Sequence, residues 1–275
     1  KSKRLGSEII RLALPATIEN VFQTLVGFFD TLLIAQLGLV AVTAVGLANT
    51  ILNVYLAVFL AIGVGGTALI ARSLGAGQKE KARQYARQTQ ELSIAGGIVF
   101  GFISIFFGRW MLQAMGASGS ALEDAQVFFY WVGGFSLLHA SMTSLGTILR
   151  ATGDTVTPMK VGIITNVTNV LLDYFLIFGF GSWDGLGILG TALGTIFARL
   201  LGCYLLTREV QKSELALSFQ KSRHRKDYQE LVHLTIPAAL ERLVMRLGQV
   251  IYFSLIVALG TTVYASHMIA GNIES

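Results

Sequence analysis

Charged residues are scarce in this sequence. Only 13% of its 275 residues are Asp, Glu, Lys or Arg, and 53% are hydrophobic, whereas soluble globular domains carry about 25% charged residues. The segments 31–71 and 247–273 contain no charged side chain at all. A water-facing surface is difficult to build from this composition, so we expect a membrane protein.

Cysteine and proline are also nearly absent. The single cysteine, Cys203, excludes an internal disulfide framework and a cysteine metal cage. Three prolines in the whole chain favour long helices over a turn-rich architecture. The sequence has no Walker lysine motif, no HExxH pair and no GxSxG elbow, which are the marks of nucleotide-binding and hydrolytic sites. We therefore expect neither an enzyme nor a bound cofactor.

Long apolar stretches separated by charge clusters predict seven helices long enough to cross a bilayer. These stretches lie at 9–36, 44–71, 88–108, 124–148, 158–179, 186–207 and 234–258. An eighth begins near Thr262 and is incomplete. Barrel strands would instead alternate in pieces of about 10 residues, and no such pattern is present. The sequence predicts an all-α polytopic membrane protein.

Positive charge is distributed unevenly along the chain. Of the 21 Lys and Arg residues, 17 lie in the N-terminal tail and in the segments 72–87, 149–160 and 208–232, whereas the loops expected on the other side hold only Arg109. By the positive-inside rule, the N-terminus is cytoplasmic. The net charge of +5 is therefore explained by orientation in the plasma (cell inner) membrane, without a nucleic-acid partner.

The first and seventh predicted spans resemble each other. LALPATIENVFQTL, from Leu12, aligns without a gap with LTIPAALERLVMRL, from Leu234, and a constant shift of 222 residues gives eleven identities over 40 positions. An even number of spans separates the two copies, so both copies cross the membrane in the same direction. Parallel repeats of this kind form the two halves of many transporters, with the substrate site near the midplane between them.

The repeat divides the chain into three parts. We predict an N-terminal lobe of six transmembrane helices at 1–207, a cytoplasmic linker at 208–232 and the start of a C-terminal lobe at 233–275. A complete second lobe needs spans seven to twelve, so the sequence is expected to cover about seven and a half of twelve spans. Pro15 and Pro237 occupy matching positions and are hinge candidates, because each removes one helix hydrogen bond. Alternatively, each proline is simply tolerated in the first turn of its helix and has no hinge role.

Acidic residues inside predicted spans are costly unless they are neutralised, paired or hydrated, so they mark candidate functional sites. Two polar stripes run along the predicted helices: Asp30 with Glu19 and Gln23, and Asp173 with Asn166 and Asn169. Two carboxylates facing one pocket can share a single proton, because two like charges disfavour each other, or they can bind Na+ through their oxygens. Capping of a broken helix is the alternative for each Asp.

Other polar residues in the spans have structural explanations too. Asn49 and Asn53 are expected either to line the same N-lobe cavity or to bond across helices. Glu19 is expected to pair with Arg11. Arg199, inside the sixth span, is expected to extend toward the cytoplasmic face.

Four segments, taken together, resemble the multidrug and toxic compound extrusion (MATE) family of transporters. They are LALPATIENVFQTLVGFFDTLLIAQLG at 12–38, ARSLGAGQKEKA at 71–82, LRATGDTVTPM at 149–159 and GLGILGTALGT at 185–195. They follow the family's order and extend over nearly all of the first lobe. The resemblance implies a MATE-like fold of two six-helix lobes, and the export of amphipathic, often cationic, compounds in exchange for H+ or Na+.

The resemblance also implies roles for single residues. A coupling site for H+ or Na+ in the N-lobe falls on Asp30, Asn169, Asp173 and Thr191. The seventh span has no acid deep inside it, and Tyr252 stands at the repeat position of Asp30. This departure favours the DinF-like branch over the NorM-like branch. The partners implied are a small-molecule substrate and the lipid bilayer, and the full-length protein is expected to be a monomer.

Other functions are less consistent with these residues. A flippase for lipid-linked saccharides, from the same superfamily, needs a larger and more cationic cavity, and few basic residues of the N-lobe are expected to point inward. A membrane-embedded enzyme such as a prenyltransferase needs DDxxD-type acid clusters, and the sequence has none. The parallel repeat argues against a channel.

Overall fold

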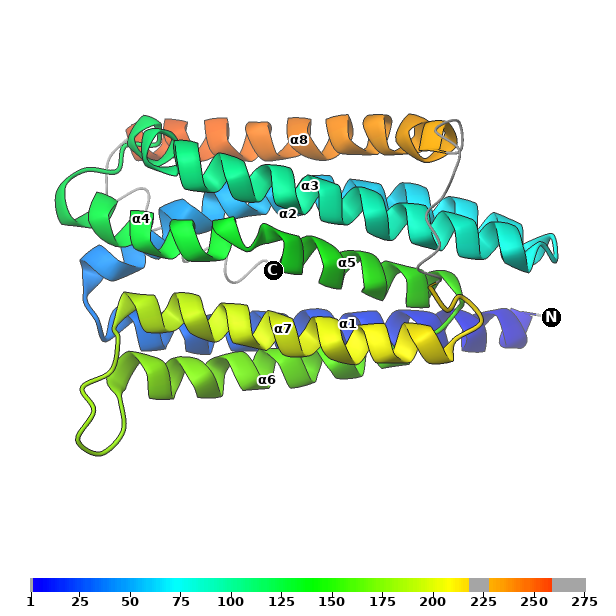
Figure 1. The fold of residues 1–275 in the computed structure, drawn as a ribbon, viewed down its shortest axis with the longest axis horizontal. Helices are drawn as coiled ribbons and strands as arrows, with labels where there is room; N and C mark the ends of the chain where they lie inside the picture. Colours follow the sequence, from blue (N-terminus) through cyan, green and yellow to red (C-terminus); the bar gives the residue numbers. More distant parts are fainter. Residues whose placement is uncertain (1, 218–227, 259–275) are drawn as a thin grey trace.

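The computed structural model describes residues 2–217 and 228–258, and every regular element among them is a helix (Figure 1). In chain order the helices are α1 (Ser2–Ala35), α2 (Leu39–Gly75), α3 (Lys79–Ala114), α4 (Gly119–Gly134), α5 (Ser136–Ala151), α6 (Val156–Phe178), α7 (Ile188–Lys212) and α8 (Tyr228–Ala258). The prediction of an all-α fold is confirmed.

Most of these helices are suited to a membrane. Within the described part of the chain, five are long and apolar enough to cross a bilayer, or six if α4 and α5 form one bent span. α8 coincides with the seventh predicted span but is not among them, because Glu241, Arg242 and Arg246 interrupt its apolar sequence. The predicted eighth span, from Thr262, lies outside the described residues.

The fourth predicted span, 124–148, is not one straight helix. α4 and α5 are bent by 48° relative to each other, with the break at Phe135. Gly133 and Gly134 precede the break, and the Ser136 hydroxyl donates a hydrogen bond to the Gly133 carbonyl oxygen at 2.5 Å. Glycine weakens a helix, and a serine hydroxyl that takes a backbone carbonyl bends one. The prediction of a continuous helix was wrong at this point.

Small residues bring α3 close to the bent pair. A Cβ atom on Gly97 would lie 2.4 Å from Leu137 Cα, and one on Gly101 would lie 2.6 Å from the Gly134 carbonyl oxygen. Backbone atoms cannot move aside as a flexible side chain can. Both positions therefore require glycine, as is usual where membrane helices pack closely.

The connections alternate between the two ends of the bundle (Figure 1). The N-terminus, the α2–α3 turn, the α5–α6 turn and the end of α7 lie at one end, and the α1–α2, α3–α4 and α6–α7 connections lie at the other. The first end gathers the segments rich in Lys and Arg, and we call it the basic end. The structure thus brings together the segments that the charge distribution assigns to one side of the membrane.

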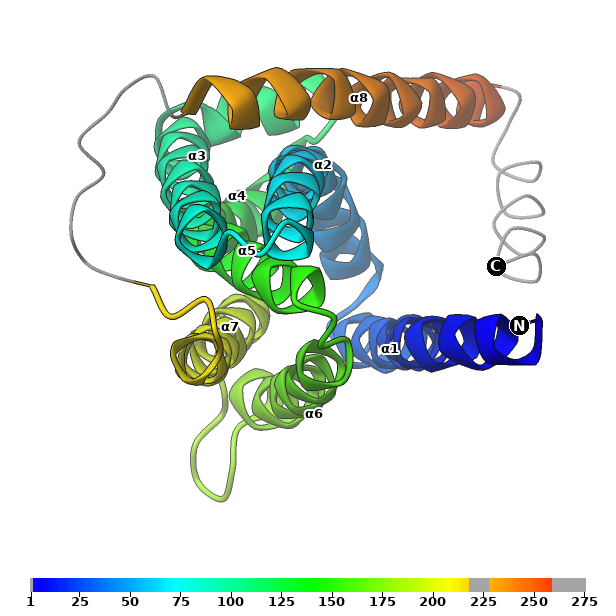
Figure 2. The same cartoon turned by 90° about the vertical axis from the view of Figure 1, so that its right-hand side faces the viewer.

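α8 lies against α2 and α3 (Figure 2). Near the basic end, Glu230 Oε2 accepts hydrogen bonds from the Tyr85 hydroxyl at 2.5 Å and from Arg72 Nη2 at 3.4 Å, and the Tyr228 hydroxyl donates to Glu91. We call these five residues the α8 clamp. The hydrogen bond from Tyr85, aided by the charges of Lys81 and Arg72, lowers the pKa of the Glu230 carboxyl below its usual value.

Candidate functional site

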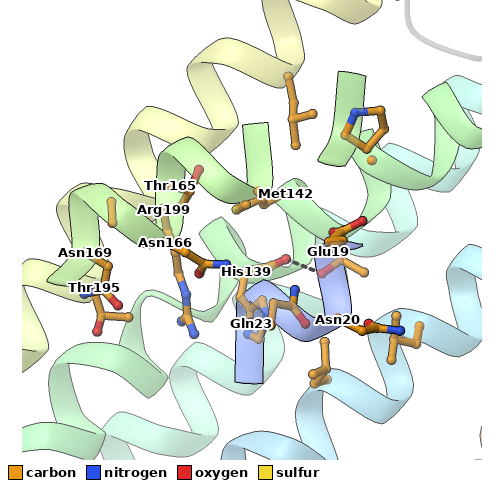
Figure 3. Close-up of a pocket in the computed structure, with 18 of the residues that line it drawn as sticks. Glu19, Asn20, Gln23, His139, Met142, Thr165, Asn166, Asn169, Thr195 and Arg199 are labelled. Atoms are coloured by element: carbon orange, nitrogen blue, oxygen red, sulfur yellow. Dashed lines mark hydrogen bonds between the residues drawn. The ribbon is translucent and has the colours of Figure 1, made fainter. Parts of the chain in front are cut away.

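A cavity of about 520 Å³ lies inside the bundle (Figure 3). Its polar lining comes from four helices: Glu19, Asn20 and Gln23 of α1, His139, Thr143 and Arg150 of α5, Thr165, Asn166 and Asn169 of α6, and Thr195 and Arg199 of α7. α2 adds only Leu56 and Leu60. This volume falls within the range of about 300–1,000 Å³ that is typical of small-molecule sites.

Two of the four residues predicted to line the cavity do so. Gln23 and Asn166 are both in its wall. Asn49 and Asn53 are exposed on α2 and are not among the residues that line this cavity. The reason is that α2 packs with its small apolar residues, such as Ala48, and its asparagines lie on a different face of the helix.

The two predicted acids meet at the end of the cavity marked by Asn169. Asp173 of α6 is fully buried, and its carboxyl group lies close enough to that of Asp30 of α1 for the two groups to interact electrostatically. Asn169 Nδ2, one turn earlier on α6, donates a hydrogen bond to Asp173 Oδ1 at 3.2 Å. The structure therefore places three of the four predicted coupling residues together, although they come from two helices far apart in sequence.

α7 forms the remaining wall beside Asp173. A Cβ atom on Gly194 would lie 1.9 Å from Asp173 Oδ1, so only glycine leaves room for the carboxyl group. Thr191, the fourth predicted coupling residue, is buried three positions earlier on the same helix, and this spacing places both residues on one face. Sequence reasoning missed Gly194, because a glycine that makes space for a side chain can be recognised only when that side chain lies against it.

Several oxygens around this acid pair have no partner. Asp30 Oδ1, Asp173 Oδ2 and Thr191 Oγ1 are buried without a hydrogen bond to any residue that the structure describes, although buried polar atoms are nearly always satisfied. The described residues contain no group of three or more His, Cys, Asp or Glu side chains that could hold a metal ion. Two carboxyls, an amide and a hydroxyl instead suit a shared proton or a hard monovalent cation bound through oxygens.

Glu19 has a different partner from the one expected. Arg150 Nη2 of α5 lies 3.0 Å from Glu19 Oε1 and 2.9 Å from Glu19 Oε2, and 15% of the Glu19 side chain is exposed. The predicted partner, Arg11, has a side chain outside the described part. The ion pair connects α1 to α5 at the cavity wall.

Arg199 lies in the wall of the cavity, and its extension toward a cytoplasmic face stays a prediction. Figure 3 shows its guanidinium group in the space between Asn166, His139 and Thr195. An arginine inside an apolar span is itself a signal of a polar interior. Because Arg150 and Arg199 both line the cavity, its wall is more basic than the sequence suggested.

The hinge candidates lie within continuous helices. α1 runs through Pro15 and α8 through Pro237, so neither proline ends its helix. Pro15 is buried and Pro237 is exposed. A hinge at either residue stays a prediction.

Comparison with known proteins identifies the family. A protein-family model described as MatE matches residues 15–175, more than half of the chain. This chain belongs to the MatE family. The resemblance of its four segments to MATE transporters is thereby confirmed at the level of the family, and the chain is part of a membrane-embedded transporter family.

Curated relatives of this MatE chain are named transporters or resistance proteins. The probable multidrug resistance protein NorM of Thermotoga maritima is 32% identical over 98% of the chain and 59% of its own length. The uncharacterized transporter YisQ of Bacillus subtilis is 32% identical over 94% of the chain and 59% of its own length. The chain thus spans about three fifths of these relatives. Neither relative is named as an enzyme, in agreement with the expectation from sequence.

Solved structures show the same fold. A MOP superfamily transporter from Pyrococcus furiosus matches with a TM-score of 0.88 at 24% identity, over 97% of this chain and 59% of that one. The MATE transporter VcmN of Vibrio cholerae, in its bent form, matches with a TM-score of 0.87 at 24% identity, over 99% of this chain and 61% of that one. The predicted MATE-like fold is confirmed.

Proposed function

We propose that the protein at its natural length is a secondary active transporter, which exports amphipathic drugs or metabolites by antiport with H+ or Na+. We assign the coupling ion to Asp30, Asn169, Asp173 and Thr191. The observation that carries this assignment is the set of three buried oxygens without partners around two interacting carboxyl groups. One proton shared by the carboxyl groups, or one Na+ coordinated by the oxygens, would give these oxygens the partners that they lack.

The mechanism follows from linkage between the ion and the substrate. The acid pair and the cavity share Asn169, which lines the cavity and donates a hydrogen bond to Asp173. Filling or emptying the ion site therefore changes groups that a substrate contacts. If ion and substrate oppose each other's binding, the reciprocal free energy drives export. Rocking of the lobes, or bending of α1 near Pro15, would then expose the cavity to the other side.

The arrangement in the membrane is part of the proposal. We assign 1–207 to the N-terminal lobe, 208–232 to a cytoplasmic linker and 233–275 to the start of the C-terminal lobe. We also assign the basic end to the cytoplasm of a cell whose plasma membrane holds the protein as a monomer. The location of both acids in the N-lobe supports the DinF-like branch.

The experiment that tests this function measures dye transport in proteoliposomes containing the protein at its natural length. Rhodamine 123, a cation, and rhodamine 110, which carries a free carboxylate, are followed separately under an imposed H+ gradient and an imposed Na+ gradient. We expect one gradient to drive transport and Asp173→Asn to abolish it. Asp184→Asn, on an exposed loop residue, is the matched control and keeps wild-type rates.

Two results would contradict the proposal in different ways. If Asp173→Asn transports as well as wild type, the ion site is assigned to the wrong residues. If neither gradient drives either dye, antiport itself is wrong. The flippase would then be the better function, since Arg150 and Arg199 in the cavity wall are the cationic groups that a lipid-linked saccharide diphosphate requires.

A further inference from the structure

The cavity contains a positive charge that no side chain in the described part of the chain neutralises. Arg199 lies on α7 among apolar helical neighbours and is only partly exposed. Across the residues described, no ion pair and no hydrogen bond links it to another side chain. An arginine keeps its charge in proteins. A charge left in this position costs free energy unless water or a ligand compensates for it.

The other charged groups near the cavity are already paired. Glu19 is bonded to Arg150, and Asp30 and Asp173 interact with each other at the far side of Asn169. The cavity wall itself therefore has an excess of one positive charge, contributed by Arg199.

The groups around Arg199 are suited to an anion. Asn166 and Gln23 carry amide donors and Thr195 carries a hydroxyl donor, and all three line the same cavity as the guanidinium group (Figure 3). A guanidinium group presents two parallel N–H donors that match the two oxygens of a carboxylate. The volume of about 520 Å³ leaves room for the apolar part of a small molecule besides its acidic group.

We infer that the N-lobe cavity binds the carboxylate of a small amphipathic acid or zwitterion at Arg199, with Asn166 and Thr195 as further donors. This inference names the substrate class of the proposed transporter and so rests on that proposal. The family resemblance implied amphipathic, often cationic, compounds, and this inference adds an acidic group to that class. A carboxylate at Arg199 restores neutrality in the cavity, whereas a simple cation adds a second positive charge to it.

The test uses two dyes that differ in one carboxylate. Rhodamine 110 has a free carboxylate, and rhodamine 123 is its methyl ester. Binding to the detergent-solubilised protein at its natural length is measured by fluorescence anisotropy, without a membrane or a gradient. We expect wild type to prefer rhodamine 110. We expect Arg199→Gln to weaken rhodamine 110 binding by about tenfold or more, as for the loss of a hydrogen bond to a charged group, and to leave rhodamine 123 binding unchanged.

Two further variants and a competitor make the result specific. Arg199→Lys keeps the charge without the paired donors and should retain part of the preference. Arg109→Gln, at the opposite end of the bundle and bonded to Gln126, should retain all of it. The preference is the ratio of the affinities for rhodamine 110 and rhodamine 123, measured on the same preparation of each variant. A loss of folded protein therefore does not alter it. Displacement of rhodamine 110 by an anionic phospholipid would mean that Arg199 holds a lipid headgroup, and would overturn the small-acid inference.

The remaining outcomes separate this inference from the proposed antiport. If wild type does not prefer rhodamine 110, or if Arg199→Gln keeps the preference, the carboxylate site is wrong, whatever the transport assay shows. If the preference depends on Arg199 while no ion gradient drives transport, the binding site stands and the antiport proposal falls.

Discussion

α1 and α8 have related sequences and very different surroundings. Each is a long helix that runs through a proline, with a glutamate four residues later. Glu19 of α1 lies at the cavity and is bonded to Arg150, whereas Glu241 of α8 is exposed. Pro15 is buried, whereas Pro237 is exposed. A shared sequence therefore produced the same helix twice, and the neighbouring helices decided what each copy does.

α1 and α8 pack against different helices. α1 packs mainly on α6 and contributes Asp30 to the acid pair. α8 packs on α2 and α3, and the α8 clamp holds it near the basic end. Under the proposed function, α1 contributes to ion coupling and α8 has a connecting role, and the two roles can be separated experimentally.

The largest expected difference concerns the repeat positions Asp30 and Tyr252. Asp30→Asn removes one of the two interacting carboxyls, so we expect gradient-driven transport by the protein at its natural length to fall by about tenfold or more. Tyr252→Phe changes the matching position of α8 and should leave transport within about twofold of wild type. Initial rates in proteoliposomes, normalised to inserted protein, measure both. Equal losses of transport in the two variants would contradict the proposed difference in role between α1 and α8.

The next difference is in stability. Glu19→Gln leaves Arg150 at the cavity wall without its partner, and we expect a loss of about 1–3 kcal/mol, below the value for fully buried pairs because Arg150 is partly exposed. Glu241→Gln should change stability by less than about 0.5 kcal/mol. Thermal unfolding in detergent measures both. The double variant Glu19→Gln with Arg150→Gln should recover part of the loss, and no recovery would mean that the ion pair is not the cause.

A smaller contrast concerns the two prolines. Pro237→Ala restores a helix hydrogen bond at an exposed position, so we expect a gain of about 1 kcal/mol. Pro15→Ala restores the same bond but removes a buried ring from its packing, so the gain should be smaller or reversed in sign. Unfolding temperatures of the two variants against wild type test this order. A larger gain at Pro15 would show that its ring is strained in the folded protein.

The smallest effect is a pH dependence confined to α8. The pKa of the Glu230 carboxyl is lowered in the folded protein, so its contribution to stability is present above the usual glutamate pKa, near 4.3, and is lost as the pH falls below it. We expect the hydrogen-exchange protection factors at the start of α8, corrected for the intrinsic pH dependence of exchange, to fall slightly below about pH 4.5. Glu230→Gln should remove this dependence, and exchange in α1 should not share it. The effect is small because Glu230 is exposed.

Much of the fold followed from local sequence. Apolar length and charge clusters located α1 to α3 and α6 to α8, because a membrane helix satisfies its own backbone and needs only a sufficiently long apolar stretch. The break at Phe135 was missed. Its cause is local: the Ser136 hydroxyl donates a hydrogen bond to the Gly133 carbonyl oxygen and competes with the helix backbone for it. Hydropathy averaged over a whole span does not detect such a contact.

The candidate site was only partly predictable. Asp30, Asn169 and Asp173 stand out in sequence as polar residues in apolar helices, and the structure brings their side chains together. Asn49 and Asn53 carry the same polar signal but are exposed away from the cavity. Composition identifies residues that need a polar environment, and it does not specify which of them share one.

By itself, the sequence determined a helical membrane protein, most of its long apolar helices and the acids that needed an explanation, because hydropathy and helical periodicity act within a single segment. Only the tertiary structure decided that Arg150 pairs with Glu19, that Gly194 makes room for Asp173 and that Arg199 faces a cavity. These contacts join helices far apart in the chain. Their geometry depends on how whole helices pack, which no local pattern records.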